Sequence, residues 1–231
     1  MLKTTPLETL HKQFDAEFTE YYGYSMPGSY SQLSKELDGL KQSSAAFDLC
    51  AFSRVAISGK DAEELLNTVF PKASLPSEEC WDWASEDKKV RILNSSNEYL
   101  LLIHPQISDN ILERVNSIAS RMKVNITDKT EKTAMLGVYG PSSYEMIGSI
   151  IPLDITALEP GKVMNVSFFM MSLTMIRGSW LGSDGVELIC PVGASKFATQ
   201  AIGKYQKRES IVPAGTVCFE AAFEEYVSQT V

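Results

Sequence analysis

Two segments of the sequence follow the same order of strand, glycine, helix and proline. The half-buried strand pattern SRVAIS is followed by Gly59, and an amphipathic helical stripe then ends before Pro71. The strand pattern AMLGVY is followed by Gly140, and a second stripe ends before Pro152. Gly140 follows Gly59 by 81 residues, and Pro152 follows Pro71 by the same 81 residues. This shared register favours an internal duplication, and the alternative is a chance similarity between two ordinary β–α units.

The second half of each unit has a counterpart as well. In the first copy, the strands VRIL and EYLLLI precede a helix over 111–122 and the short strand KVNIT. In the second copy, FFMMSLTMI and VELIC read as strands and precede a helix over 197–205. Each copy therefore reads as βαββαβ, the ferredoxin-like pattern. The predicted fold class is α+β, with two ferredoxin-like lobes.

The pattern divides the chain into three segments. Residues 1–49 are predicted to form a helical segment, with helices over 7–22 and 33–40 joined by an ordered loop, packed on the lobes. The first lobe is predicted over 50–129 and the second over 130–231.

Charge and cysteine content exclude several classes of protein. The chain has 231 residues and a net charge of −8, which argues against general binding of nucleic acid or of an anionic membrane. The four cysteines form no CxxC pair and read as thiols of a reducing compartment. The N-terminus has no signal-peptide pattern, and VSFFMMSLTMI is too short to span a membrane. We expect a soluble, cytoplasmic protein.

The motif inventory limits the chemistry. His11 and His104 are the two histidines of the chain, so a His-rich metal site is excluded. His11 reads as a surface histidine on a helix, and His104 closes a strand. A Ser/His/Asp arrangement around His104 stays open, although the chain has no GxSxG elbow. Neither common nucleotide fingerprint is present.

The segment RGSWLGSDGVELICP, residues 177–191, is the most unusual one. Glu187 lies on a strand face with Ile189 and is flanked by apolar residues. Its carboxylate could accept two parallel hydrogen bonds from an Arg guanidinium or from an amino-pterin ring, or it could lie on the wet face of the strand. Trp180 could stack on a flat ligand or plug the core.

The order of several motifs along the chain resembles the glycine cleavage system T-protein, a tetrahydrofolate-dependent aminomethyltransferase. The matches are TPLETLHKQF with GYSMPGSY, then AAFDLCAFSRVAISGKDAEELL, GVYGPSSYEMI, WLGSDGVEL and IVPAG. They span almost the whole chain. The resemblance implies two ferredoxin-like lobes with folate bound between or through them. It implies that Glu187 holds the pterin ring and that Trp180 and Phe52 line the folate cavity.

The chain also departs from that family. The resemblance implies an Asp on the strand that promotes transfer, yet SEDKKVRIL has none on the strand, and Asp87 is expected in the loop before it. Phe219 takes the place of a family Arg, Ser183 takes the place of a Glu, and the family's terminal β-barrel is not seen. VRILNSSNEYLLLIHP looks like the gamma subunit of heterotetrameric sarcosine oxidase, a shorter relative. A third branch, folate-binding proteins of iron–sulfur assembly, would need a KGCYTGQE motif that the sequence lacks.

These features give two functional hypotheses. The first is a tetrahydrofolate-binding, aminomethyltransferase-like protein with reduced or no stand-alone transferase activity. The alternative is a non-catalytic subunit or assembly module of a larger complex. Without the terminal barrel, apolar surface should be uncovered, so we expect a homodimer or a hetero-complex.

Overall fold

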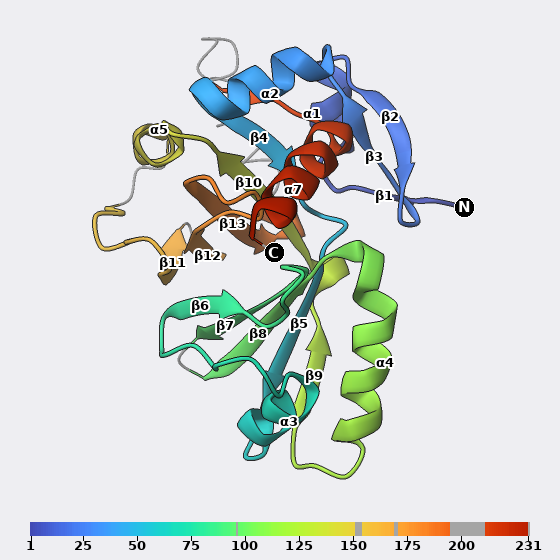
Figure 1. The fold of residues 1–231 in the computed structure, drawn as a ribbon, viewed down its shortest axis with the longest axis vertical. Coiled ribbons are helices and arrows are strands. Elements are labelled where there is room, and N and C mark those ends of the chain that lie inside the picture. Colours follow the sequence, from blue (N-terminus) through green and yellow to red (C-terminus); the bar gives the residue numbers. More distant parts are fainter. Residues whose placement is uncertain (96, 151–153, 169–170, 195–210, 231) are drawn as a thin grey trace.

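The computed structural model describes residues 1–95, 97–150, 154–168, 171–194 and 211–230. They form three β-sheets of five, six and three strands. Figure 1 shows the five-stranded sheet in one lobe, and the six-stranded sheet in a second lobe beside the N-terminal segment. The predicted α+β class with ferredoxin-like lobes is confirmed.

The first lobe is built on the five-stranded sheet, in the order β6-β7-β8-β5-β9. Its elements are β5 (Ser53–Ser58), α3 (Ala62–Val69), β6 (Cys80–Trp83), β7 (Val90–Ser95), β8 (Glu98–Ile103), a 3₁₀ turn (Pro105–Ile107), α4 (Ser108–Ala119) and β9 (Asn125–Asp128). Alternate residues of the strands face opposite sides, so Val55 and Ile57 pack under α3 and α4 while Ala56 faces the other lobe. The edge strand β6 is the element that the sequence patterns did not predict.

The second lobe is built on the six-stranded sheet, in the order β11-β12-β13-β10-β4-β14. Its elements are β4 (Ala45–Asp48), a 3₁₀ turn (Thr130–Lys132), β10 (Thr133–Tyr139), α5 (Ser143–Ile150), β11 (Val163–Phe168), β12 (Met171–Arg177), β13 (Gly185–Pro191), a 3₁₀ turn (Val192–Ala194), β14 (Val212–Pro213) and α7 (Thr216–Thr230). The stretch predicted as one strand, FFMMSLTMI, is divided between β11 and β12, which pair antiparallel. The helix predicted over 197–205 lies outside the described residues.

The two repeat units occupy equivalent places, as predicted. β5 lies between β8 and β9, and β10 lies between β13 and β4, with antiparallel pairing throughout. The place of β9 in the first lobe is therefore taken in the second lobe by β4, which comes from the N-terminal segment. Gly59 and Gly140 have φ of +113° and +124°, and a Cβ on either would lie 2.5 Å from the carbonyl oxygen of Lys123 or Ser43, just before β9 and β4. Glycine is required at the same point of both units.

The N-terminal segment differs from the prediction. The helix expected over 7–22 covers α1 (Glu8–Gln13) alone, and the following residues form a hairpin of β2 (Glu17–Tyr21) and β3 (Tyr24–Ser29), with β1 (Lys3–Thr4) beside β3. Tyr22 and Gly23 have positive φ, which gives the two-residue turn that suits a hairpin. This turn overrides the helical spacing of the apolar residues. The second predicted helix is confirmed as α2 (Leu33–Gln42).

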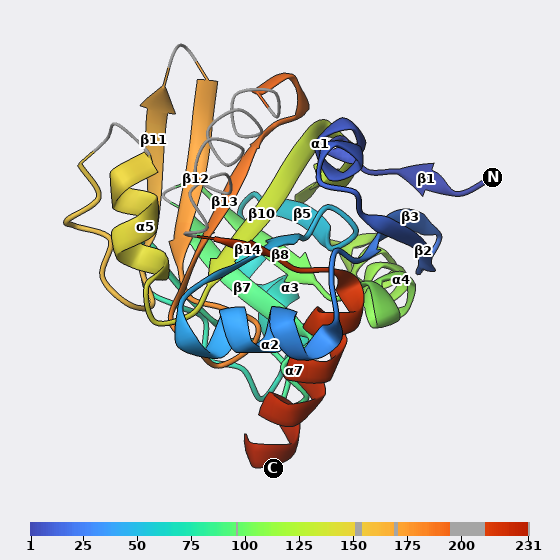
Figure 2. The same ribbon diagram turned by 90° about the horizontal axis from the view of Figure 1, so that it is seen from above.

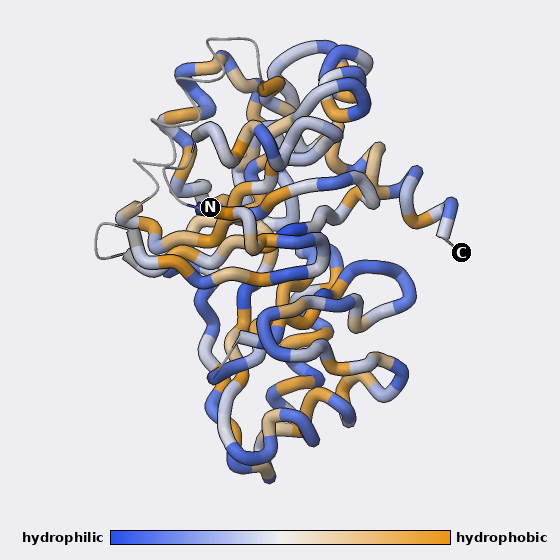
Figure 3. Tube along the Cα trace, turned by 90° about the vertical axis from the view of Figure 1, so that its left-hand side faces the viewer, coloured by the Kyte–Doolittle hydropathy of each residue, from blue (hydrophilic) through white to orange (hydrophobic). Residues whose placement is uncertain are grey.

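Among the described residues, the largest core lies between the five-stranded and the six-stranded sheets and joins the lobes. Leu93, Leu100 and Leu102 of the first lobe pack there with residues of the second lobe and with Phe219 and Phe223 of α7. Figure 2 shows α2 and α7 side by side, and Figure 3 shows hydrophobic residues concentrated along the strands in the middle of the molecule. The predicted segment boundaries at 49/50 and 129/130 stay a prediction. Among the described residues, no helix is long and apolar enough to cross a membrane.

Candidate functional site

Glu187 lies between the lobes and is paired with protein groups. Its side chain is fully buried, on the face of β13 that looks toward the first lobe. Nη2 of Arg91, on β7, donates to Oε1 at 2.7 Å and to Oε2 at 2.5 Å. The hydroxyl of Tyr139, on β10, donates to Oε1 at 2.6 Å. Burial raises the pKa of the Glu187 carboxyl, and Arg91 and Tyr139 oppose that rise. The carboxylate thus accepts from a guanidinium, one of the two donors that the sequence suggested.

Strand register and two glycines place Tyr139 against Glu187. Gly137 is the register partner of Glu187, and Tyr139 is the partner of Gly185. A Cβ at Gly137 would lie 2.6 Å from Cζ of Tyr139, and one at Gly185 would lie 2.5 Å from its Cδ1. The ring therefore lies across two positions that have no side chain, and its hydroxyl reaches the carboxylate.

Three tryptophans surround the guanidinium of Arg91. Its Cζ lies 4.3 Å from the ring centroid of Trp180, 4.8 Å from that of Trp81 and 5.5 Å from that of Trp83. Trp81 is fixed by a hydrogen bond from its Nε1 to the carbonyl oxygen of Arg177, at 2.9 Å. Such cation–π contacts stabilise a desolvated guanidinium. We call Trp81, Trp83, Trp180, Tyr139 and Glu187 the guanidinium cage.

The hydrogen bonding of the cage is incomplete. Nε and Nη1 of Arg91 have no hydrogen-bond partner among the described residues, and neither has Nε1 of Trp180. All three atoms are buried. Unpaired buried donors are uncommon in native proteins and destabilise them, so their presence at one place makes the cage a candidate site.

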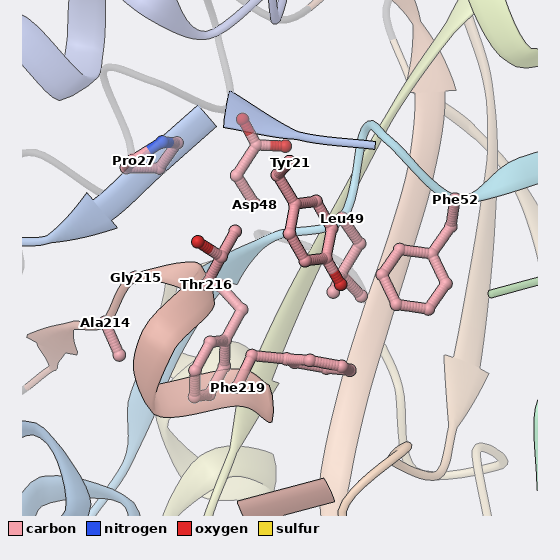
Figure 4. Close-up of a pocket in the computed structure, with 10 residues that line it drawn as sticks. Tyr21, Pro27, Asp48, Leu49, Phe52, Ala214, Gly215, Thr216 and Phe219 are labelled. Carbon is pink, nitrogen blue, oxygen red and sulfur yellow. The ribbon is translucent and has the colours of Figure 1, made fainter. Parts of the chain in front are cut away.

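Phe52, the third predicted site residue, joins the same cluster. Its ring is buried and its centroid lies 4.8 Å from that of Trp180 and 5.4 Å from that of Phe219. Phe52 also lines a small cavity with Tyr21 and Phe219, as Figure 4 shows. The cavity measures about 10 Å³, which is room for one water. The described residues therefore bring Glu187, Trp180 and Phe52 together inside the core, where each is at most 1% exposed.

His104 contacts an acid and not a serine. It follows β8, its Nδ1 accepts from the backbone N–H of Gln106 at 3.3 Å, and its Nε2 lies 3.3 Å from Oε1 of Glu220. The same oxygen accepts a hydrogen bond of 2.5 Å from the hydroxyl of Tyr21. Burial opposes ionisation of Glu220, but the nearby His104 and the hydrogen bond from Tyr21 lower its pKa. A Ser/His/Asp arrangement around His104 is not formed by the described residues.

The surface position expected for His11 is wrong. His11 is buried, because α1 is short and packs against the segment that carries Asp48. Its Nε2 lies 2.7 Å from Oδ2 of Asp48, and its Nδ1 lies 2.6 Å from the hydroxyl of Tyr30. Asp48 also accepts from the hydroxyl of Thr5 and from the backbone N–H of Cys50. This network ties Thr5 and α1 to β4.

Asp48→Asn should destabilise the protein at neutral pH by about 1–3 kcal/mol, because it weakens these hydrogen bonds in the interior. Burial raises the pKa of Asp48, yet the bonds from His11, Cys50 and Thr5 outweigh burial and hold it below the ordinary value. The contribution of the carboxylate is therefore present above the unfolded pKa of about 4 and is lost as pH falls through the folded pKa. Urea unfolding at pH 7 and pH 3 measures this difference. A penalty that does not shrink at pH 3, or an equal penalty for the exposed Asp38→Asn, would contradict it.

The sequence patterns missed Arg91, Tyr139, Trp81 and Trp83. One signal was available in the sequence. Arg91 interrupts the apolar residues of the strand VRIL, and an arginine in a buried strand requires a hydrogen-bond acceptor. Asp87 lies before β7, as predicted, and its Oδ1 accepts from the backbone N–H of Lys89. Phe219 packs in the core between the lobes.

Two ferredoxin-like lobes that enclose a carboxylate between their sheets define a T-protein-like fold. The family model described as the GCVT N-terminal domain matches residues 86–226, and the chain belongs to this family.

Curated relatives agree with the family. The chain is 28% identical to the "Probable aminomethyltransferase" of Aeropyrum pernix, over 94% of this chain and 62% of that protein. It is 25% identical to the aminomethyltransferase of Deinococcus deserti, over 97% of this chain and 66% of that protein. The chain thus spans about three-fifths of the length of the curated relatives it matches.

Solved structures share the fold. The aminomethyltransferase T of the glycine cleavage system from Bartonella henselae superposes with a TM-score of 0.82 at 18% identity, covering 96% of this chain and 62% of that one. Heterotetrameric sarcosine oxidase from Corynebacterium sp. U-96 contains a chain that superposes with a TM-score of 0.57 at 9% identity, covering 77% of this chain and 92% of that one. The fold is therefore shared by proteins named as transferase and as oxidase.

Proposed function

We propose that this chain is an aminomethyltransferase-family protein with reduced or no stand-alone transferase activity, which works as a subunit or assembly module of a larger complex. One observation carries the proposal: the guanidinium of Arg91 lies against Glu187, where the resemblance expects the pterin ring of tetrahydrofolate. Transfer to folate by this chain alone would require the pterin ring to occupy that position.

These residues match tetrahydrofolate in their chemistry but leave no space for its pterin ring. A carboxylate and aromatic walls suit the donor edge and the flat ring of a pterin. Arg91, however, fills the position at Glu187, and the cavity beside Phe52 measures about 10 Å³, which is too small for a ring. The pterin therefore does not fit among these residues in this conformation.

The strand expected to carry a catalytic Asp supports the same proposal. β7 has the sequence VRILNS, with Arg91 facing Glu187 and no carboxylate on the strand. Asp87 lies in the preceding loop, and its side chain is 46% exposed. A carboxylate in that position does not face the space between the lobes where transfer would occur.

The assembly part of the proposal rests on the relatives and on exposed apolar residues. A chain of heterotetrameric sarcosine oxidase, named as a multi-chain protein, shares this fold over most of its own length. Leu33 of α2 is 40% exposed and Val217 of α7 is 50% exposed, and α2 and α7 pack side by side. Association through α2 and α7, as a homodimer or a hetero-complex, would cover these two side chains. Four free thiols favour a reducing compartment such as the cytoplasm.

A second candidate function is tetrahydrofolate binding through Glu187, Trp180 and Phe52. The observation that favours it is their convergence in one cluster with an aromatic wall around a carboxylate.

Calorimetric titration with tetrahydrofolate separates the two candidates. We expect no saturable binding by the wild type, and no transfer from an aminomethyl carrier. If folate does bind through Glu187, the Glu187→Gln variant should lose about 30- to 150-fold in affinity, because a charge-assisted bidentate pair is replaced. Saturable binding together with full stand-alone transfer activity in the wild type would overturn the proposed function. Asp87→Asn is the matched control and should change neither measurement.

A further inference from the structure

The guanidinium cage has the chemistry of a ligand site. Glu187 presents two acceptor oxygens, and three indole rings supply flat apolar walls. Carboxylate oxygens side by side select a planar group with adjacent N–H donors, and aromatic faces select a delocalised cation over a compact ammonium. Guanidinium groups and 2-amino-pyrimidine rings share this donor edge.

Arg91 fills the cage without completing its hydrogen bonds. Nη2 alone reaches both oxygens of Glu187, while Nε and Nη1 have no partner among the described residues. An arginine built for a permanent structural role is expected to satisfy its fork, since unpaired buried donors lose their hydration without compensation. Nε1 of Trp180, a wall of the same cage, is also unpaired among those residues.

One wall of the cage lies at the edge of its sheet. Trp81 and Trp83 are on β6, the terminal strand in the order β6-β7-β8-β5-β9, and both are partly exposed. One side of β6 pairs with β7, and on its other side the N–H of Trp81 donates to the carbonyl oxygen of Gly161 and Cys80 forms a bridge with Lys162. The two tryptophans of β6 therefore form the wall of the cage nearest the surface, while Glu187 and Trp180 are 0% exposed.

We infer that the guanidinium cage is a binding site for a planar group with two adjacent N–H donors, and that Arg91 is its built-in occupant and competes with any such ligand. The inference deepens the proposed function, since Arg91 becomes the residue that denies a pterin edge its acceptor. It also stands apart from folate, because the cage should accept any small planar guanidinium once Arg91 is shortened.

The test uses Arg91→Ala with methylguanidinium, which replaces the deleted group, and methylammonium, a compact cation of the same charge. We expect Arg91→Ala to bind methylguanidinium with a Kd of about 1–10 mM, to change its tryptophan fluorescence and to unfold at a higher temperature in its presence. Methylammonium should do neither. The wild type should not bind methylguanidinium. Arg177→Ala is the matched control, because Arg177 stacks on Tyr144 and pairs with Asp184 near the surface.

Tetrahydrofolate is then titrated into the same proteins. We expect Arg91→Ala to bind it at least about tenfold more tightly than the wild type, because the competing charged pair is gone. Binding of methylguanidinium but of no folate by Arg91→Ala would support the cage and would remove folate as its ligand. Equal folate affinity in wild type and Arg91→Ala would overturn the competition by Arg91 while leaving folate binding intact.

A poorly stable Arg91→Ala variant still gives an answer. In that case methylguanidinium, and not methylammonium, should raise its unfolding temperature and restore its near-ultraviolet circular dichroism. Equal effects of the two cations, or no effect of either, would overturn the inference. The double variant Arg91→Ala/Glu187→Gln should lose the response to methylguanidinium, since the acceptor pair is removed.

Discussion

Arg91→Met should lower the free energy of unfolding by about 3–5 kcal/mol, because it leaves the carboxylate of Glu187 buried without its cation. Both side chains of the pair are 0% exposed, so solvent does not screen the lost interaction. The hydrogen bond from Tyr139 remains, but one neutral donor does not replace a guanidinium. Chemical unfolding of the wild type and the variant measures the difference.

The double variant Arg91→Met/Glu187→Gln is the control for this result. Its cost should fall well below the sum of the two single costs, because no unpaired charge is left in the core. Additive costs would show that the two side chains do not act as a pair.

The deficit of Arg91→Met should also depend on pH. Burial already raises the pKa of Glu187, and removal of Arg91 removes the charge that opposes this rise. A carboxyl with a raised folded pKa contributes stability below its unfolded pKa, and that contribution is lost as pH rises through the folded pKa. The deficit relative to wild type should therefore be smaller at pH 5 than at pH 8. The opposite trend would exclude Glu187 as the cause.

Arg54→Met should cost a similar amount, about 3–5 kcal/mol, because several buried carbonyls lose a charged donor at once. Arg54 is 0% exposed, and its Nη1 and Nη2 donate to backbone oxygens of residues 49–52 and 130–133, the two crossing segments that connect the lobes. The shortest of these bonds reach Phe52 O and Thr130 O, each at 2.5 Å. Burial lowers the pKa of Arg54, and the guanidinium has no carboxylate hydrogen-bond partner among the described residues.

Arg54→Lys tests whether the charge or the planar fork matters. An ammonium cannot reach both crossing segments, so most of the loss should remain. The exposed Arg114→Met is the control and should stay within about 0.5 kcal/mol of wild type. Full stability in Arg54→Lys would show that charge alone is sufficient.

Local patterns predicted the strands with clear alternation, and missed the hairpin of β2 and β3 and the edge strand β6. The strand alternation and Gly59 predicted β5 and α3, and the same pattern predicted β10 and α5. Helical spacing in the N-terminal segment was misleading, because the turn at Tyr22 and Gly23 decides the hairpin.

The candidate site shows a different limit, which is the distance along the chain between its residues. The alternation of side chains correctly placed Glu187 on the same strand face as Ile189. The family resemblance predicted that Trp180 and Phe52 lie in the same cluster. The partner, Arg91, is 96 residues away in the chain, and no local pattern specifies a contact at that separation. The presence of Arg91 in an apolar strand indicated that a hydrogen-bond acceptor was needed, but not which residue supplies it.

The position of β4 beside β10 makes the first lobe an insertion within the second. Residues 45–48 and 133–139 pair in one sheet, and the whole five-stranded sheet lies between them in sequence. During synthesis the first lobe can therefore close on its own, whereas the second must hold β4 unpaired until β10 follows. Any shortened version that starts after β4 would expose the edge of β10, and edges of that kind invite pairing with other chains.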